Sequence, residues 1–482
     1  MTNTIAAEEF QSYIGGRTAG DGAVIAWDSP ALSGAATSFA SASVAQVDQA
    51  VRLAHGAQMQ WADMPPLVRQ HFLYEFAKKI EGDAETLGRM DCTDMGKPIS
   101  VAIQEAHVTA FILRYYAGAI DKVAGQVIPS VREALTVSYP RPYGVVGAMI
   151  SWNYPAINAA MKFAPALAAG NAIVLKPSDQ APRSAIRLAA LAEEAGLPRG
   201  LYVALAGGAE TGRALCSHAG VDMLAFTGST RVGREVAQMA AAQVIPAIIE
   251  AGGKNPILVC DDITDIEGMA RDVIAEAFAN SGQLCSARSK IVVPKAMVGR
   301  IGEALAAAAA ATLPGAALEA ATTHGPLSSL THANRITNAV DRAMQAGGQV
   351  LRDGRGKDPL LQGISLIAAG AGAEIFREEY FGPVLAMGTY DWIEDGVALA
   401  NAGGYGLAAT IWTGDIGRAN ALSRQVVAGH IKVKSQPGID AGTGMALPIE
   451  PAGKSGYGTE WGVAALQSYT RRQAVEFQGF RL

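Results

Sequence analysis

Residues 143–150 read "YGVVGAMI", a short apolar run rich in branched side chains, and five further runs of this kind follow before residue 260. Helix-period stretches such as "SAIRLAALAEEAG" (184–196) and "RVGREVAQMAAA" (231–242) lie between them. This alternation predicts a parallel sheet with crossover helices, and hence an α/β fold. The further runs are 171–176, 201–205, 222–226, 245–250 and 256–259.

The loops that follow these runs are rich in glycine and polar residues. A parallel sheet binds its ligands at the carboxyl ends of its strands, so these loops are where we expect a site. They read "SWNYP" (151–155), "KPSDQAP" (176–182), "FTGST" (226–230) and "EAGGKNP" (250–256).

The flanking sequence extends this α/β pattern. Apolar positions three and four apart predict covering helices over 43–64 and 69–90. A second α/β pattern begins near residue 260, and the chain's 482 residues exceed what one hydrophobic core usually holds, so we expect a second domain there. Its predicted elements are helices over 264–281, 303–312 and 332–348 and a strand over 290–293.

Composition and charge exclude several classes of protein. Hydrophobic residues make up 50% of the chain and charged residues 17%, as in a compact enzyme. The net charge of -5 is scattered without a run of like charges, which argues against a nucleic-acid partner. The acidic start lacks the pattern of a signal peptide, and no stretch is apolar enough for a membrane span. Four dispersed cysteines without a CxxC pair predict a cytoplasmic protein with no disulfide framework and no metal site.

Seven short motifs occur in an order and spacing similar to those of the aldehyde dehydrogenase superfamily. They cover nearly the whole chain, and together they are far more specific than any one alone. The resemblance implies an NAD(P)-dependent enzyme of the non-acylating type. The motifs are "SWNYP" (151–155), "KPSD" (176–179), "FTGST" (226–230), "EAGGKNP" (250–256), "NSGQLC" (280–285), "EEYFGPV" (378–384) and "YGLAA" (405–409).

The resemblance assigns the nucleophile to Cys285, which on its own would more often be a small buried hydrophobe. In this family the corresponding cysteine attacks the aldehyde to form a thiohemiacetal and then a thioester. Small neighbours such as Gly282 and Ser286 leave room for substrate and nicotinamide to reach the sulfur. Asn153 matches the family's oxyanion donor, together with the backbone N–H of Cys285, although an asparagine there could equally be a turn residue.

Two further residues match the family's proton-transfer positions. Glu250 stands at the position of the general base, 35 residues before Cys285, where the alternative is a solvated loop carboxylate. Its presence favours hydrolysis of the thioester over transfer to coenzyme A. Lys162 matches a lysine near the active site that is sometimes assigned to proton relay.

The resemblance also implies a bound NAD, with NADP as the alternative. Lys176 and Asp179 match residues that hold the adenosine ribose, unless they are an exposed surface pair. Gly228 and Ser229 open a predicted helix and can donate to the pyrophosphate at its N-terminus. The remaining cofactor contacts it implies are Ile150, Trp152, Gly208, Phe226, Glu379 and Phe381.

The substrate is the least defined part of this interpretation. Tyr154, Asn158 and Met161 fall where relatives line the substrate tunnel. Arg288 and Lys290 could attract a carboxylated aldehyde, but cations just before a strand more often lie on the surface. The family usually reads PFGGxKxSGxGxE near the C-terminus, whereas this chain has "PIEPAGKSGYGTE" (448–460), which predicts a different loop at the substrate mouth.

We therefore expect oxidation of an aldehyde to a carboxylic acid. The alternatives are a semialdehyde dehydrogenase acting on a carboxylated aldehyde and a non-catalytic nucleotide-binding member of the fold. The family implies a homodimer or homotetramer, and the C-terminal tail alternates enough to pair as an edge strand across a dimer. The predicted architecture is a Rossmann-type dinucleotide-binding domain (1–122 and 143–251), an α/β catalytic domain (252–449) and a small oligomerisation element (123–142 and 466–482).

Overall fold

The computed structural model describes residues 11–32, 36–439 and 441–480, so the acidic start of the chain lies outside the described residues. Its largest sheet has eight strands in the order β2-β1-β9-β8-β7-β10-β11-β21. The five central strands are parallel, and β1 and β21 join them antiparallel. In sheet order the strands are Arg17–Ala19, Ser12–Ile14, Tyr202–Ala204, Ala172–Lys176, Val145–Met149, Met223–Thr227, Ala247–Glu250 and Gly456–Tyr457.

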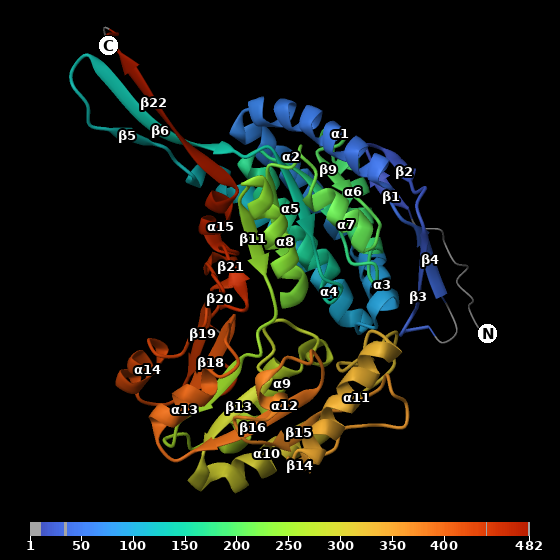
Figure 1. The fold of residues 1–482 in the computed structure, drawn as a ribbon, viewed down its shortest axis with the longest axis vertical. Helices are drawn as coiled ribbons and strands as arrows, with labels where there is room; N and C mark the ends of the chain where they lie inside the picture. The colour runs from blue at the N-terminus through green and yellow to red at the C-terminus, as the bar shows by residue number, and fades with distance from the viewer. Residues whose placement is uncertain (1–10, 33–35, 440, 481–482) are drawn as a thin grey trace.

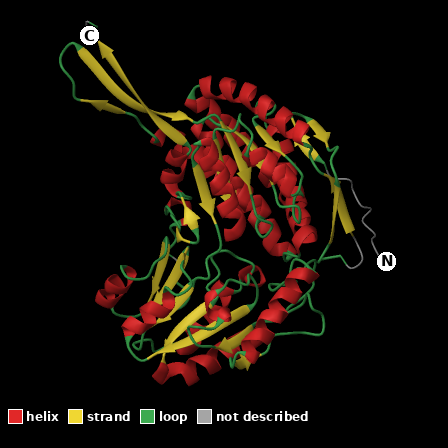
Figure 2. Cartoon of the chain, viewed as in Figure 1, coloured by secondary structure: helices red, strands yellow, loops and turns green. Residues whose placement is uncertain are grey.

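Helices cover both faces of this sheet, which is why every residue of β7 and β10 is buried (Figures 1 and 2). The predicted covering helices are present, but as three rather than two. Pro65 and Pro66 separate the first from the second, and the chain breaks again at Asp83. The helices around this sheet are α1 (Val44–Asp63), α2 (Pro66–Gly82), α3 (Ala84–Met95), α4 (Ile99–Ala119), α5 (Pro155–Ala169), α6 (Arg183–Glu194), α7 (Ala209–Cys216), α8 (Thr230–Gln243) and α15 (Gly462–Ser468).

A second sheet has seven strands in the order β14-β15-β16-β13-β12-β18-β19. The run 256–259, which the alternating pattern groups with the strands of the first sheet, forms β12 in the second. The two sheets have equally apolar strands, so composition does not show where the chain crosses between them. In sheet order the strands are Gln349–Arg352, Ser365–Ala368, Val384–Tyr390, Lys290–Pro294, Pro256–Val259, Ala408–Trp412 and His430–Lys434.

The second sheet is also buried on both faces. Leu258 and Val292 pack into one hydrophobic cluster, whereas their neighbours Ile257, Val259 and Ile291 pack into another, as the alternation of side chains along a strand requires. The predicted helices are present within slightly different limits. The helices of this half are α9 (Ile266–Ala277), α10 (Val298–Ala311), α11 (Leu330–Gln345), α12 (Glu374–Arg377), α13 (Ile393–Ala400) and α14 (Ile416–Ser423).

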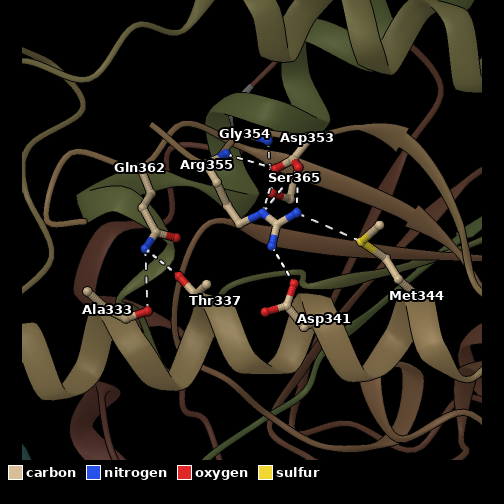
Figure 3. Close-up of polar contacts among 9 residues, drawn as sticks. All are labelled: Ala333, Thr337, Asp341, Met344, Asp353, Gly354, Arg355, Gln362 and Ser365. Atoms are coloured by element: carbon tan, nitrogen blue, oxygen red, sulfur yellow. Dashed lines mark hydrogen bonds and ion pairs between the residues drawn. The ribbon is translucent and has the colours of Figure 1, made fainter. Parts of the chain in front are cut away.

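The long loop between β14 and β15 is tied down by polar side chains (Figure 3). Arg355 donates to Asp341 on α11 at 2.5 Å and to Asp353 within the loop at 2.6 Å. Further along, Gln362 donates to Thr337 on the same helix at 3.1 Å. The loop is therefore held against α11 at both of its ends.

A three-stranded antiparallel sheet projects from the rest of the chain (Figure 1). The C-terminal strand β22 (Thr470–Gln478) pairs along its whole length with β6 (Ala134–Pro142), whose other edge pairs with β5 (Gln126–Ile128). The tail thus forms an edge strand, and its partner here lies in the same chain.

The remaining elements are β3 (Val24–Asp28), β4 (Ala36–Ala40), β17 (Tyr405–Gly406), β20 (Ala452–Gly453) and the short helices Ile120–Lys122, Ala279–Gly282, Lys295–Met297 and Gly444–Ala446. In the described parts of the chain, no helix is long and apolar enough to cross a membrane.

Candidate active site

A cavity of about 1090 Å³ lies at the carboxyl ends of the first sheet's parallel strands. Strands β7, β8, β10 and β11 all run in one direction, so the loops that follow them open on the same side. These loops are the ones that the sequence singled out. All of the predicted cofactor residues line this cavity, namely Ile150, Trp152, Lys176, Asp179, Gly208, Phe226, Gly228, Ser229, Glu379 and Phe381.

Cys285 is half-buried in the wall of the same cavity. The backbone before it is unusual, because Asn280, Ser281 and Gly282 all have positive φ angles of 50°, 58° and 75°. A Cβ at Gly282 would also lie 2.5 Å from the Gly382 carbonyl oxygen, so only glycine fits there. Burial, followed by the nearby Glu250 carboxylate, raises the pKa of the Cys285 thiol to about 12. The thiol is therefore protonated in the free site.

Asn153 is buried beside this loop and bridges it to the first sheet. Its Nδ2 donates to the Gln283 carbonyl at 3.0 Å, and its Oδ1 accepts from the Ser151 hydroxyl at 2.7 Å. Asn280 in turn donates to the Asn153 carbonyl at 3.1 Å. The amide is thus fixed in orientation, and only one of its two N–H groups is used by these bonds.

Glu250 ends β11 and is buried in the cavity wall. Its Oε1 has no hydrogen-bond partner among the described residues. Burial, followed by repulsion from Glu460, raises the pKa of Glu250 well above its ordinary value, while Lys162 acts in the opposite direction. The site therefore favours the protonated form of this carboxyl more than bulk water does.

Glu460 is a site residue that the sequence interpretation missed. It lines the cavity and forms a buried ion pair with Lys162, which lies on α5 behind the cavity wall. Backbone bonds to Ile449 fix its position from both sides. Lys162 itself does not line the cavity, but it acts on the site by its ion pair with Glu460 and by its charge effect on Glu250. The last glutamate of the "PIEPAGKSGYGTE" motif was the signal that could have identified this residue.

One part of the cavity wall comes from both halves of the chain and is formed by Glu379, Phe381 and Trp152. The Glu379 carboxylate accepts the Gly253 N–H at 2.8 Å, and burial raises its pKa. The rings of Phe381 and Trp152 meet edge to face at 5.6 Å. Lys176 extends along the opposite side, where its Nζ donates to the Pro177 carbonyl at 2.8 Å and burial lowers its pKa to about 8.

The expectation that Arg288 and Lys290 lie on the surface is wrong. Arg288 is 5% exposed and lines the cavity, whereas Lys290 is 2% exposed and points away to donate to the Ala402 carbonyl at 2.6 Å. Arg288 precedes β13 and Lys290 begins it, and packing against this sheet buries both side chains. The predicted tunnel residues Tyr154, Asn158 and Met161 line the cavity, as does Ile449 of the altered C-terminal loop. Among the described residues, no group of His, Cys, Asp and Glu is arranged to hold a metal ion.

A large cavity at the carboxyl ends of a parallel sheet is typical of nucleotide-binding α/β enzymes. The chain belongs to the aldehyde dehydrogenase family, whose model matches residues 18–475.

Individual relatives agree with this family. The chain is 35% identical over 436 residues to the NADP/NAD-dependent aldehyde dehydrogenase PuuC of Escherichia coli. This match covers 89% of this chain and 87% of that protein. A solved NAD-dependent aldehyde dehydrogenase from Sinorhizobium meliloti matches with a TM-score of 0.94 at 30% identity, over 99% of this chain and 97% of its own. The solved gamma-glutamyl-gamma-aminobutyraldehyde dehydrogenase of Burkholderia cenocepacia matches with a TM-score of 0.93 at 33% identity. The match covers 98% of this chain and 97% of that one. The protein is therefore an NAD(P)-dependent aldehyde dehydrogenase, and the predicted fold and reaction class are confirmed.

Proposed function

We propose that the enzyme converts an aldehyde and water to a carboxylic acid through a covalent intermediate on Cys285. The observation that supports this most is that Cys285, Asn153 and Glu250, from three separate segments, line one cavity. A panel of aldehydes with NAD, followed by NADH absorbance and by analysis of the acid formed, tests the proposal. Aldehyde-dependent NADH formation without acid would contradict it.

The first step requires a thiolate at Cys285. Because burial raises the pKa of this thiol to about 12, a neighbouring base has to take its proton. Glu250 is the carboxylate with the largest electrostatic effect on the thiol, and its own raised pKa makes it a stronger base than an exposed glutamate. The Ser286 N–H then donates to the sulfur and favours the charged form.

Attack of the thiolate on the aldehyde carbon places a negative charge on the former carbonyl oxygen. We assign the donors for this oxyanion to the second N–H of Asn153 and the backbone N–H of Cys285. The bonds of Asn153 to Gln283 and Ser151 orient its amide before substrate arrives, so no reorganisation is needed during the reaction.

The residues present fit a dinucleotide cofactor. Ser229 caps α8 by accepting the Val232 N–H, so the other N–H groups of the first turn remain for a pyrophosphate. Lys176, Asp179 and Gly208 would hold the adenosine end, and Glu379 and Phe381 the nicotinamide end. When bound, NAD accepts the hydride that leaves the thiohemiacetal carbon.

The thioester that remains on Cys285 has to be hydrolysed. Glu250, once deprotonated, removes a proton from the attacking water, and Cys285 leaves as the thiolate. The unpartnered Oε1 of Glu250 is available to accept that proton. This carboxylate supports the non-acylating type of reaction.

Lys162 and Glu460 set the basicity of Glu250 in this proposal. In Glu460→Gln, a negative charge beside Glu250 is lost and Lys162 is released from its partner, and both changes lower the pKa of Glu250. The rising limb of the kcat/KM profile is therefore expected to move to lower pH. The buried unpaired Lys162 should also cost about 3–5 kcal/mol of unfolding free energy, measured in urea.

The exposed Glu303→Gln on α10 is the matched control for this variant. A double variant, Lys162→Met with Glu460→Leu, should regain most of the stability because no unpaired charge is left buried. If the rising limb of the kcat/KM profile stays at the same pH in Glu460→Gln, Glu460 does not act on Glu250.

We expect a preference for NAD over NADP because of Asp179. This half-buried carboxylate lies on the loop after β8, within 3.4 Å of the Ser178 hydroxyl, and would repel the additional phosphate of NADP. Nearby Lys176 offsets this only in part. In Asp179→Asn the ratio of kcat/KM for NAD to that for NADP should fall roughly tenfold or more. An unchanged ratio, or a wild-type enzyme that prefers NADP, would contradict this role.

We further propose a cytoplasmic homodimer or homotetramer in which the three-stranded sheet of β5, β6 and β22 contacts a second copy. The open edges of that sheet and its projection from the chain support this role (Figure 1). In the same way, we propose that the first sheet and its helices (1–122 and 143–251) bind the cofactor and that 252–449 forms the catalytic domain. Residues 450–465 join the two by adding β21 to the first sheet.

A further inference from the structure

Arg288 presents a buried charge that the proposed chemistry does not use. Its Nε donates to the Thr410 hydroxyl at 3.2 Å and its Nη1 to the Ser286 carbonyl at 2.9 Å. Its Nη2 has no hydrogen-bond partner among the described residues, although the side chain is only 5% exposed. A buried guanidinium nitrogen without an acceptor is costly, so its retention calls for a ligand that supplies one.

Two basic side chains lie with Arg288 in the same wall of the cavity. His430 and Lys432 alternate along β19, so they project from one face of the sheet, and Lys432 lies opposite Thr410 in the register of β18 and β19. We call Arg288, His430 and Lys432 the basic wall. Burial, followed by the positive charge of Arg288, lowers the pKa of His430.

Glu276 is the carboxylate with the largest electrostatic effect on Arg288, but it also pairs with two lysines. Lys432 and Lys434 pair with Glu276 at 3.1 Å, and Lys434 also pairs with Asp272. These four side chains balance one another in charge. Arg288 forms no ion pair within 4.0 Å among the described residues, so its positive charge is left over.

The basic wall adjoins the reacting sulfur and lies apart from the expected phosphate contacts. Arg288 bonds to the carbonyl of Ser286, the residue next to Cys285, and interacts electrostatically with Cys285 itself. Gly228 and Ser229, by contrast, lie on the first sheet between β10 and α8. A substrate bound to Cys285 would therefore extend past Arg288, whereas a cofactor phosphate would not.

We propose that the basic wall binds a carboxylate carried by the substrate, so that the enzyme acts on short-chain aldehydes with a carboxylate at the far end. This inference rests on the proposed function of Cys285. The guanidinium supplies a charge-assisted hydrogen bond from Nη2, and the ammonium of Lys432, although paired with Glu276, offers further donors. The bonds of Arg288 to Thr410 and Ser286 hold the side chain in place before the substrate binds.

The test compares succinic, glutaric and adipic semialdehydes with butanal, pentanal and hexanal. In the wild-type enzyme, kcat/KM should be higher for at least one semialdehyde than for its uncharged counterpart. Arg288→Met should lower this semialdehyde-to-aldehyde ratio roughly tenfold to a hundredfold. Arg288→Lys should keep part of the ratio, because it retains a charge but not the planar fork. Arg300→Met, an exposed arginine on α10 outside the cavity, should leave the ratio unchanged.

A second variant and a second measurement guard against misfolding of the Cys285 loop in Arg288→Met. Lys432→Met removes neither of the Arg288 bonds to Thr410 and Ser286, and it should also lower the ratio. Glutarate should raise the melting temperature of the wild type more than that of either variant. Unchanged ratios in both variants, or a wild type that prefers the uncharged aldehydes, would overturn the inference. Failure to oxidise either class would instead refute the proposed function itself.

Discussion

Cys285→Ala is expected to abolish aldehyde oxidation while cofactor binding survives. The alanine cannot form a thiohemiacetal, and removal of a covalent nucleophile lowers turnover on the order of a millionfold in a well-studied hydrolase. The residues expected to bind the adenosine end lie on other loops, so the NADH dissociation constant should change little. Turnover is measured by NADH absorbance and binding by fluorescence titration.

The other cysteines provide controls for this variant. Cys92 and Cys260 are fully buried in α3 and after β12, and neither lines the cavity. Their replacement by alanine should leave the chemistry intact. Retained turnover in Cys285→Ala would move the nucleophile elsewhere.

Glu250→Gln is expected to slow release of the acid by roughly a hundredfold to ten-thousandfold, the usual contribution of a general base. The amide keeps the size of the side chain but cannot accept a proton from water. Acyl-enzyme should therefore accumulate, and intact-protein mass after addition of aldehyde and NAD should show an adduct on Cys285. Because Glu250 also takes the proton of Cys285 in this proposal, the initial burst of NADH should become smaller. Wild-type steady-state turnover would move the base to another carboxylate.

The pH dependence gives an independent check of the same residue. Burial and Glu460 raise the pKa of Glu250, and the base acts only when deprotonated. Activity should therefore rise with pH through a value above the ordinary range of a glutamate, and this limb should disappear in Glu250→Gln. Loss of activity as pH rises through that range would contradict the assignment.

The sequence predicted many of the residues that line the cavity, because they belong to short motifs in loops. Asn153 follows β7 and Glu250 ends β11, and parallel strands bring their carboxyl ends together whatever the exact packing, whereas Cys285 was predicted from its own motif in the loop between α9 and β13. The central strands of the first sheet were predicted for the same reason, since apolar runs of this length have few other interpretations.

What could not be predicted depends on contacts between distant segments. Arg288 looked exposed because its local pattern says nothing of the helices that cover β13. Glu460 gains its significance from Glu250 and from Lys162, which is 298 residues away along the chain.

The separation between Lys162 and Glu460 has a consequence during synthesis. At about 5–20 residues per second, a ribosome needs roughly 15–60 s to make the 298 residues between them. Over that interval Lys162 has no partner, α5 lacks α15, and β6 lacks β22. The first sheet and its helices therefore lack these contacts until residues 456–478 are made, and we expect chaperones to protect this half of the nascent chain.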